Sequence, residues 1–292
     1  MSRKLIHINY LLGCLSLGVF LICSCSQDQT TSSRSGETKH LTDFSDKSGE
    51  VNIAGGTAHI PVMQKAAKDI MSYNPKIKIT IAGGGSGVGA QQVGKGLVDI
   101  GNTGRPLKEK EQAMGLVSHA FAIDGVAIIL HPDNPISALT SEQVAKVFAG
   151  TITNWKELGG PDKAIHLFTR DEASGTRAVF VKKLLKNGPV AQHANVTPSN
   201  GSMKTSIASD SGAIGYCSIG YIDDMIKAPQ LDGVEPTNAN CVSGSYPVMR
   251  KLYMNTKGEP EGLVKTFIDF ICSKNAASYI KASGYIPLHA ED

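Results

Sequence analysis

Strong net charge and metal-binding motifs are both missing from this sequence. Its 29 Lys and Arg residues nearly balance its 26 Asp and Glu residues, so the formal net charge over 292 residues is only +3. A nucleic-acid-binding surface needs clustered basic residues, and this balance excludes that class. The eight histidines form no HExxH motif or close pair, and the six cysteines form no CxxC motif. We therefore expect neither a metal site nor a metal cofactor.

The composition also excludes a disordered chain and a coiled-coil rod. Hydrophobic residues make up 41% and charged residues 19%, as in ordinary globular proteins. The 31 glycines are unusually many, against a background of about 7%. Most of them gather in short loops. The length allows one large domain or two domains of about 120–150 residues each.

Residues 1–24 have the pattern of a secretory signal peptide. Arg3 and Lys4 precede an uncharged run over residues 5–22, and small residues follow it. The ICSC sequence at residues 22–25 resembles a bacterial lipobox, in which acylated Cys25 would anchor the protein to a lipid bilayer. The alternative is an uncleaved membrane anchor, because the run has about the length of a short transmembrane helix. We expect an exported protein on the periplasmic or extracellular face of a membrane.

Residues 25–47 are polar and nearly free of aromatic side chains, which predicts a flexible tether. Beyond Cys25, only Cys217, Cys241 and Cys272 remain. They allow at most one disulfide, and its pairing cannot be read from the sequence.

Hydrophobic periodicity predicts strands alternating with helices from residue 51 onward. The expected strands are residues 51–56, 76–83, 98–102, 121–132, 165–170 and 212–222. The expected helices are residues 59–75, 89–97, 108–114, 140–150, 177–187 and 261–283, with Thr140 or Ser141 as the cap of the fourth. This order predicts an α/β fold with mostly parallel sheets. We expect two lobes rather than one doubly wound domain, because hydrophobic cores tend to split near this length.

Four loops that join a strand to a helix are rich in glycine and hydroxyl residues. Their sequences are GGTA (55–58), GGGSGVG (83–89), GNTGR (101–105) and RDEASGT (170–176). Helix N-termini present unpaired N–H groups and partial positive charge, so such loops favour a small oxyanion. The simpler interpretation is that each loop only caps a helix. Four similar loops together favour the binding site.

Two nucleotide motifs compete with that interpretation. The sequence GSGVGA (85–90) fits the dinucleotide pattern GxGxxA and keeps a nicotinamide-dependent enzyme as an alternative. No acidic residue stands in the expected place at the end of a following strand, however. A near match to a phosphate loop at residues 89–96 has Gly96 where Ser or Thr is required, and we attribute it to chance.

From about residue 51 to residue 288 the chain resembles the substrate-binding lipoproteins of bacterial phosphate ABC transporters. The resemblance rests on GGTAHIPVMQKAA, GGGSGVG, DIGNTGRPL, DGVAII, FAGTITNWKELGG, TRDEASGTR, GAIGYCSIGYI, YPVMRKLYMNTKG and SGYIPL. It implies the periplasmic-binding-protein type II fold: two doubly wound lobes, two crossover strands and a ligand cleft between the lobes. The crossovers would lie near residues 124–131 and 246–254. Lobe 1 would comprise residues 48–125 and 247–292, and lobe 2 residues 126–246.

The resemblance also implies a site without catalysis, cofactor or metal. Inorganic phosphate would be held by Thr57, Ala58, Ser86, Thr103, Arg170, Ser174, Gly175 and Thr176. Arg170 would be the one buried cation, oriented by Glu172; a structural salt bridge is its alternative role. The partners would be phosphate and the membrane permease subunits of an ABC transporter, with a monomeric binding protein. A binder of another oxyanion, such as sulfate or molybdate, shares nearly all of these features.

Two positions depart from the family pattern. Gly56 stands where a serine is usual, which removes a side-chain donor. Gly104 stands where longer members carry an aspartate that accepts the phosphate proton. The resemblance then leaves the proton acceptor to be found elsewhere, and we expect Asp124 to supply it. The alternative is that Asp124 is only a hinge or turn residue.

Overall fold

The computed structural model describes residues 38–289. The predictions of a signal peptide, of Cys25 acylation and of the first part of the tether lie outside these residues. The strands and helices form two lobes, and each has its own hydrophobic core. The first core takes residues from both ends of the described chain, and the second takes them from the middle. This is the α/β arrangement of two lobes that the alternation of strands and helices predicts.

The first lobe is built around the strands at one end of the main sheet, in the order β2-β1-β3-β10-β4. Their bounds are β1 Gly49–Gly55, β2 Ile77–Gly84, β3 Ile100–Thr103, β4 Leu116–Leu130 and β10 Met249–Lys257, with β11 Ile286–Pro287 paired to β4. The helices are η1 Thr38–Phe44, η2 Thr57–His59, α2 Ile60–Tyr73, α3 Ser86–Gly94, α4 Glu109–Gln112, α9 Gly262–Ile271, η5 Lys274–Ala276 and α10 Ala277–Lys281. Strands β1, β2 and β3 run parallel, as short crossovers through helices require.

The second lobe continues the sheet in the order β4-β8-β6-β7. Its strands are β5 Ala138–Leu139, β6 His166–Arg170, β7 Asn195–Thr197, β8 Ala213–Ser218 and β9 Gln230–Leu231. Its helices are α5 Ser141–Phe148, η3 Trp155–Leu158, α6 Gly175–Lys183, α7 Asn200–Ala208, η4 Ile219–Tyr221 and α8 Asn238–Val242. Thr140 caps α5, because its hydroxyl accepts a bond from the Gln143 N–H while the Gln143 side chain accepts one from the Thr140 N–H. The predicted cap is confirmed.

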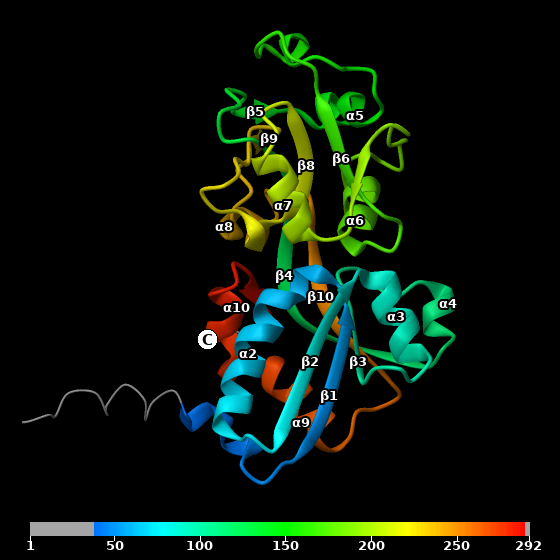
Figure 1. Cartoon of the computed structure of the whole chain (residues 1–292), viewed down its shortest axis with the longest axis vertical. Helices are drawn as coiled ribbons and strands as arrows, with labels where there is room; N and C mark the ends of the chain where they lie inside the picture. The colour runs from blue at the N-terminus through cyan, green and yellow to red at the C-terminus, as the bar shows by residue number, and fades with distance from the viewer. Residues whose placement is uncertain (1–37, 290–292) are drawn as a thin grey trace, which may run out of the picture. The chain divides into compact units, whose positions relative to one another are not determined.

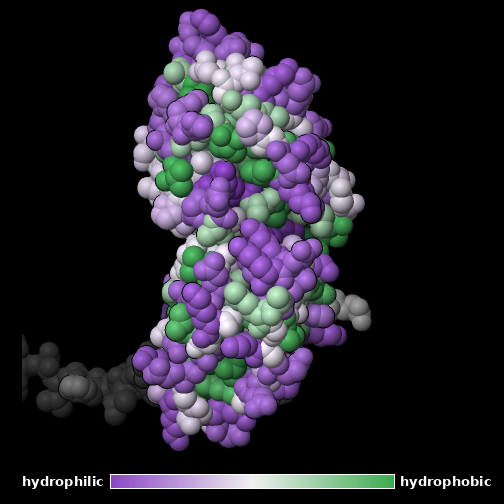
Figure 2. Space-filling model, turned by 90° about the vertical axis from the view of Figure 1, so that its right-hand side faces the viewer, coloured by the Kyte–Doolittle hydropathy of each residue, from purple (hydrophilic) through white to green (hydrophobic). Residues whose placement is uncertain are grey.

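Strand β4 belongs to both lobes. Its first part pairs with β10 as far as Gly125, and its second part, from Val126 onward, pairs with β8. Figure 1 shows β4 and β10 running side by side through the narrow region between the lobes, and Figure 2 shows the waist at that level. The buried apolar residues divide at the same place, since Phe121 and Ala122 belong to one core and Val126 to the other. This division agrees with a lobe limit at 125/126. At the second crossover Val248 still belongs to the second core and Leu252 to the first, and we keep the limits of 125/126 and 246/247 as a proposal.

The segment before β1 packs more closely than predicted. Thr38–Phe44 forms a 3₁₀ helix in which Leu41 and Phe44 are buried in the first core. Phe44 meets Phe270 edge-on at 5.5 Å between ring centroids. The Asn74 side chain donates to the Phe44 carbonyl at 2.7 Å. The prediction of a tether as far as residue 47 is therefore wrong at its end, because two apolar side chains in this polar stretch gain burial.

The predicted C-terminal helix over residues 261–283 is also wrong as a single helix. The chain forms α9, then η5, then α10, and the break lies at Ser273. The Ser273 hydroxyl accepts a bond from the Asn275 N–H, which caps a new helical turn. Cys217, Cys241 and Cys272 are all free thiols.

We predict that Phe44→Ala lowers the free energy of unfolding by about 3–5 kcal/mol, because it leaves a cavity beside Phe270. Urea unfolding of the chain checks this. The matched control is Thr42→Ala, an exposed position in the same helix, which should change stability by less than about 0.5 kcal/mol. Equal stabilities of the two variants would show that residues 38–44 do not pack on the core.

Candidate functional site

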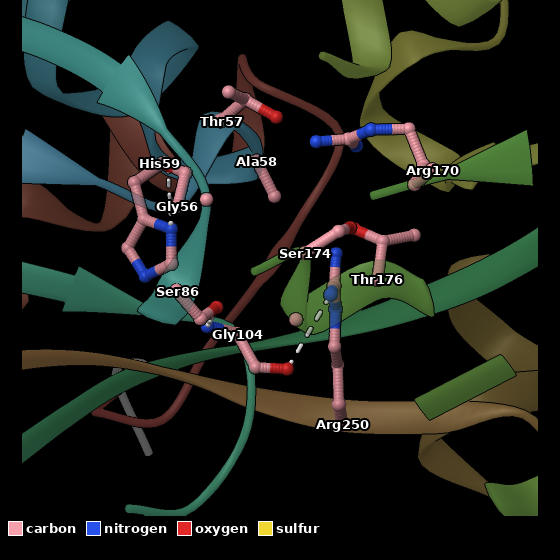
Figure 3. Close-up of a pocket in the computed structure, with 12 residues that line it drawn as sticks. Gly56, Thr57, Ala58, His59, Ser86, Gly104, Arg170, Ser174, Thr176 and Arg250 are labelled. Carbon is pink, nitrogen blue, oxygen red and sulfur yellow. Dashed lines mark hydrogen bonds between the residues drawn. The ribbon is translucent and has the colours of Figure 1, made fainter. Parts of the chain in front are cut away.

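A small cavity of about 180 Å³ lies where all four predicted loops meet. It draws residues from both lobes, as Figure 3 shows. The lining residues are Gly56, Thr57, Ala58, His59, Gly85, Ser86, Gly104, Arg170, Ser174, Gly175, Thr176 and Arg250. The structure therefore brings together Thr57, Ala58, Ser86, Arg170, Ser174, Gly175 and Thr176 of the predicted site. Thr103 and Asp124 are not among the lining residues.

Glycine lets the loops of the two lobes approach closely. Gly85 has φ +87°, and a Cβ there would lie 2.8 Å from the Ala173 carbonyl oxygen of the other lobe. The next loop residue, Gly87, donates its N–H to the same oxygen at 2.8 Å. A Cβ on Gly175 would lie only 2.1 Å from the Ser86 Oγ. Any larger side chain at Gly85 or Gly175 would force these two helix N-termini apart.

Arg170 is fixed at the end of β6 by main-chain carbonyls. Its Nε donates to the Thr197 oxygen and its Nη2 to the Pro198 oxygen, both at 2.9 Å. Its Nη1 is buried and has no partner among the described residues. Burial lowers the pKa of Arg170, yet a guanidinium keeps its charge in proteins. These two carbonyls, rather than Glu172 as expected, orient the Arg170 side chain.

Arg250 is a second guanidinium at the cavity, which the sequence analysis missed. It lies directly opposite Asp124 in the antiparallel register of β10 and β4. Its Nε donates to Asp124 Oδ2 at 2.8 Å, and its Nη2 lies 2.7 Å from the same oxygen but outside hydrogen-bonding alignment. Its Nη1 donates to the Gly104 carbonyl at 3.3 Å. The expectation that Arg170 is the one buried cation of the site is therefore wrong.

Asp124 serves as the counter-ion of Arg250. Its other oxygen, Oδ1, accepts a bond from the Ser218 hydroxyl at 2.8 Å, and the side chain is fully buried. Burial raises the pKa of Asp124, and the adjacent guanidinium opposes that rise. Because Arg250 stands between this carboxylate and the cavity lining, the expected role of Asp124 as an acceptor for a bound ligand has no geometric support.

Thr103 is committed to other partners. Its hydroxyl donates to the Arg105 carbonyl at 2.9 Å and accepts from the Asn255 amide at 3.1 Å. The side chain is buried behind the lining. Thr103 therefore stabilises the loop after β3 rather than facing the cavity.

The hydroxyls that do face the cavity already accept bonds from the protein. Thr57 Oγ1 accepts from the Asn200 main-chain N–H at 3.2 Å and from its side-chain amide at 3.0 Å. Ser86 Oγ accepts from the Gly104 N–H at 2.9 Å, and Ser174 Oγ accepts from the Arg177 N–H at 3.1 Å. A hydroxyl has one proton and two lone pairs. These bonds therefore leave the protons of Thr57, Ser86 and Ser174 as donors for a ligand.

His59 lines the cavity as a neutral ring. Its Nδ1 lies 3.1 Å from the Gly56 oxygen and its Nε2 lies 3.1 Å from the Tyr253 oxygen. Burial, together with the charge of Arg250, lowers the pKa of His59 to about 3. His59 was not among the residues expected at the site, and both of its ring nitrogens are directed at main-chain carbonyls.

Three hydrogen bonds join Thr57 to the second lobe. Two come from Asn200, and the third runs from the Tyr221 hydroxyl to the Thr57 carbonyl at 2.7 Å. The Asn200 side chain is itself fixed, because its Oδ1 accepts a bond from the Ser218 N–H. The lobes are thus in direct contact at the edge of the cavity.

The chemistry of the cavity is that of an anion site. Two guanidiniums, hydroxyl protons and the N-terminus of α6 surround a small space. Across residues 38–289 no cluster of three or more His, Cys, Asp or Glu side chains could hold a metal ion. In the same range no helix is long and apolar enough to cross a membrane.

Comparisons with known proteins agree with this geometry. A family model described as the PBP superfamily domain matches residues 30–275. The phosphate-binding protein PstS of Bacillus subtilis is 36% identical over 284 residues, which cover 96% of this chain and 94% of that protein. The phosphate-binding protein PstS of Borreliella burgdorferi is 30% identical over 250 residues, or 81% and 89% of the two chains.

Solved structures give the same result. A putative phosphate ABC transporter substrate-binding protein from Clostridium perfringens, solved with bound phosphate, has a TM-score of 0.78 and 34% identity, and covers 82% of this chain and 100% of its own. An ABC-type phosphate transport receptor from Vibrio cholerae has a TM-score of 0.66 and 34% identity, covering 81% and 99%.

The two lobes and the donor-rich cavity define a solute-binding protein of the periplasmic-binding-protein type II fold. The chain belongs to the PBP superfamily and, within it, to the family of the phosphate-binding proteins PstS. The expected fold class and family are both confirmed.

We predict that Arg250→Leu lowers the free energy of unfolding by about 3–5 kcal/mol, because it leaves Asp124 buried without its counter-ion. Adding Asp124→Asn should restore part of that loss, since the amide needs no counter-ion. Urea unfolding without added anion measures both. The exposed neighbour Lys251→Ala serves as the control. An Arg250→Leu variant as stable as this control would show that the ion pair contributes nothing to folding.

Proposed function

We propose that this protein captures inorganic phosphate outside the cytoplasm and delivers it to an ABC importer. The observation that carries the proposal is the donor set: the unpartnered Nη1 of Arg170, the guanidinium of Arg250 and three hydroxyl protons converge on one small cavity. The phosphate-binding names of the relatives support the same ligand. We propose no catalytic step, because capture and release of an anion need only hydrogen bonds and charge.

We propose direct contacts with the anion from both lobes. The proposed contacts are the hydroxyls of Thr57, Ser86, Ser174 and Thr176, the main-chain N–H groups of Ala58, Gly175 and Thr176, and the guanidiniums of Arg170 and Arg250. The Arg170 fork is rigid, and its free Nη1 lies on the cavity side (Figure 3). Thr103 and Asp124 act indirectly, through the loop after β3 and through Arg250. Arginine suits this role because its planar donor group matches an oxyanion.

Capture then couples to closure of the lobes. In the proposed sequence the anion binds one lobe and the chain bends at β4 and β10, where both strands pass between the cores. Closure forms the bonds from Asn200 and Tyr221 to Thr57. Because two of these bonds fill the lone pairs of the Thr57 hydroxyl, closure also turns that proton toward the anion. The closed form is the one that we expect the permease to recognise.

Export and anchoring complete the proposal. We propose that residues 1–24 are removed, that acylated Cys25 holds the protein at the outer face of a membrane, and that residues from 26 to about 37 form the tether. The apolar run before an ICSC sequence supports this. We propose a monomer that meets permease subunits and has no nucleic-acid partner. Acylation of Cys25 leaves three thiols, none paired in the folded part.

Calorimetric titration with phosphate, sulfate and molybdate tests the ligand. We expect one phosphate per chain, bound more tightly than the other two anions. Arg170→Met should weaken phosphate binding at least about 100-fold, because charge-assisted hydrogen bonds contribute about 1.5–3 kcal/mol each. Lys182→Ala, an exposed change in the same helix that follows Arg170, should leave the affinity unchanged.

Tighter binding of sulfate or molybdate than of phosphate would show that the ligand is another oxyanion. Saturable binding of a nicotinamide cofactor in place of phosphate would favour the dehydrogenase alternative. An Arg170→Met variant with wild-type phosphate affinity would remove Arg170 from the site.

A further inference from the structure

Arg250 occupies the space that a side chain at position 104 would need. A Cβ built on Gly104 would lie 2.7 Å from Arg250 Nη1 and 3.0 Å from its Cζ. A real Cβ does not come this close to another atom, so the guanidinium would have to shift. Its buried pair with Asp124 holds it in place. The cavity wall at this point is therefore a hydrogen-bond donor, and a carboxylate cannot stand at Gly104 while Arg250 keeps its place.

The rest of the lining is richer in hydrogen-bond donors than in acceptors. No Asp, Glu, Asn or Gln is among the lining residues. The Thr57 hydroxyl already accepts two bonds, and the hydroxyls of Ser86 and Ser174 accept one each. Main-chain carbonyls of the lining are engaged as well. The carbonyls of Gly56, Gly85 and Ser174 accept bonds from the main-chain N–H groups of His59, Gly89 and Ala178, respectively. The carbonyls of Thr57 and Ala58 accept from the hydroxyls of Tyr221 and Tyr285. The Gly104 carbonyl accepts from Arg250 Nη1.

We propose that the cavity selects the doubly charged phosphate ion, HPO₄²⁻, over the singly charged ion, H₂PO₄⁻. Each P–OH group needs an acceptor, whereas each ionised oxygen uses donors, and a buried donor or acceptor without a partner is costly. The monoanion carries two P–OH groups and the dianion one. The Gly104 carbonyl, whose bond to Arg250 is long, is the one lining oxygen that we assign to that single group. The inference rests on the proposed function, since it names the ionic form that the same site takes.

Titration of the protein's own side chains around the cavity would not produce the same pH dependence of phosphate binding. The groups that face it are His59 on η2, Arg170 on β6 and Arg250 on β10, with Asp124 on β4 behind Arg250 and two buried tyrosines. The guanidiniums stay charged, and the pKa values of the tyrosines, Tyr221 and Tyr285, are raised by burial. A bound anion raises the pKa of both His59 and Asp124. Either residue would therefore take up a proton on binding, whereas conversion of H₂PO₄⁻ to HPO₄²⁻ releases one.

Calorimetry of the whole chain at about pH 6 and about pH 8, each in two buffers of different ionisation enthalpy, tests the proposal. We expect the dissociation constant for total phosphate to be roughly tenfold larger at the lower pH, where the dianion is scarce. We also expect release of close to one proton per anion at the lower pH and almost none at the higher pH. Equal affinities at the two pH values, or proton uptake at the higher one, would overturn the proposal.

Failure of the proposed function has a different signature, because phosphate would then bind at neither pH. A pair of variants sharpens the test. Arg250→Ala with Asp124→Asn, which removes the carboxylate otherwise left without its counter-ion, should still release a proton at the lower pH. Adding Gly104→Asp to this pair places an acceptor in the vacated space and should abolish most of that release. If both variants release protons equally, position 104 does not set the ionic form. Should neither variant fold, the wild-type titration still decides.

Discussion

The buried ion pair between Asp124 and Arg250 is the interaction on which the site depends. It joins β4 to β10 at the place where both strands pass from one core to the other. A guanidinium buried this deeply needs a counter-ion, and Asp124 supplies it while Ser218 holds its second oxygen. The pair thus fixes a positive group at the wall of the cavity and leaves its Nη2 without a hydrogen-bonding partner.

The second constraint is the direction of the hydrogen bonds around the cavity. Protein N–H groups fill lone pairs on Thr57, Ser86 and Ser174, so these hydroxyls are left as donors. The bonds to Ser86 and to Ser174 each form within a single lobe, whereas the two bonds to Thr57 come from Asn200 of the other lobe. In the proposed function, recognition of an anion and contact between the lobes share an atom, the Thr57 hydroxyl oxygen. A ligand at this atom and the proposed closure would then stabilise each other.

Most of the fold and much of the site could be predicted from the sequence, because loop chemistry is local. Glycine and hydroxyl residues before a helix, as around Ser86 and Ser174, predict helix N-termini whatever the rest of the chain does. Arg250 could not be found this way. It lies in the middle of a strand, 126 positions from Asp124 in the sequence, and only the register of β10 against β4 brings the two together. The burial of Phe44 depended in the same way on a distant partner, Phe270.

A crystal structure of the protein grown with inorganic phosphate tests the central claim most directly. The account predicts phosphate in the cavity, with Arg170 Nη1 and Arg250 Nη2 at hydrogen-bonding distance from its oxygens and the Asp124 carboxylate still paired with Arg250. An anion oxygen in direct contact with the Asp124 carboxylate, or phosphate bound elsewhere with Arg250 turned away from the cavity, would contradict it.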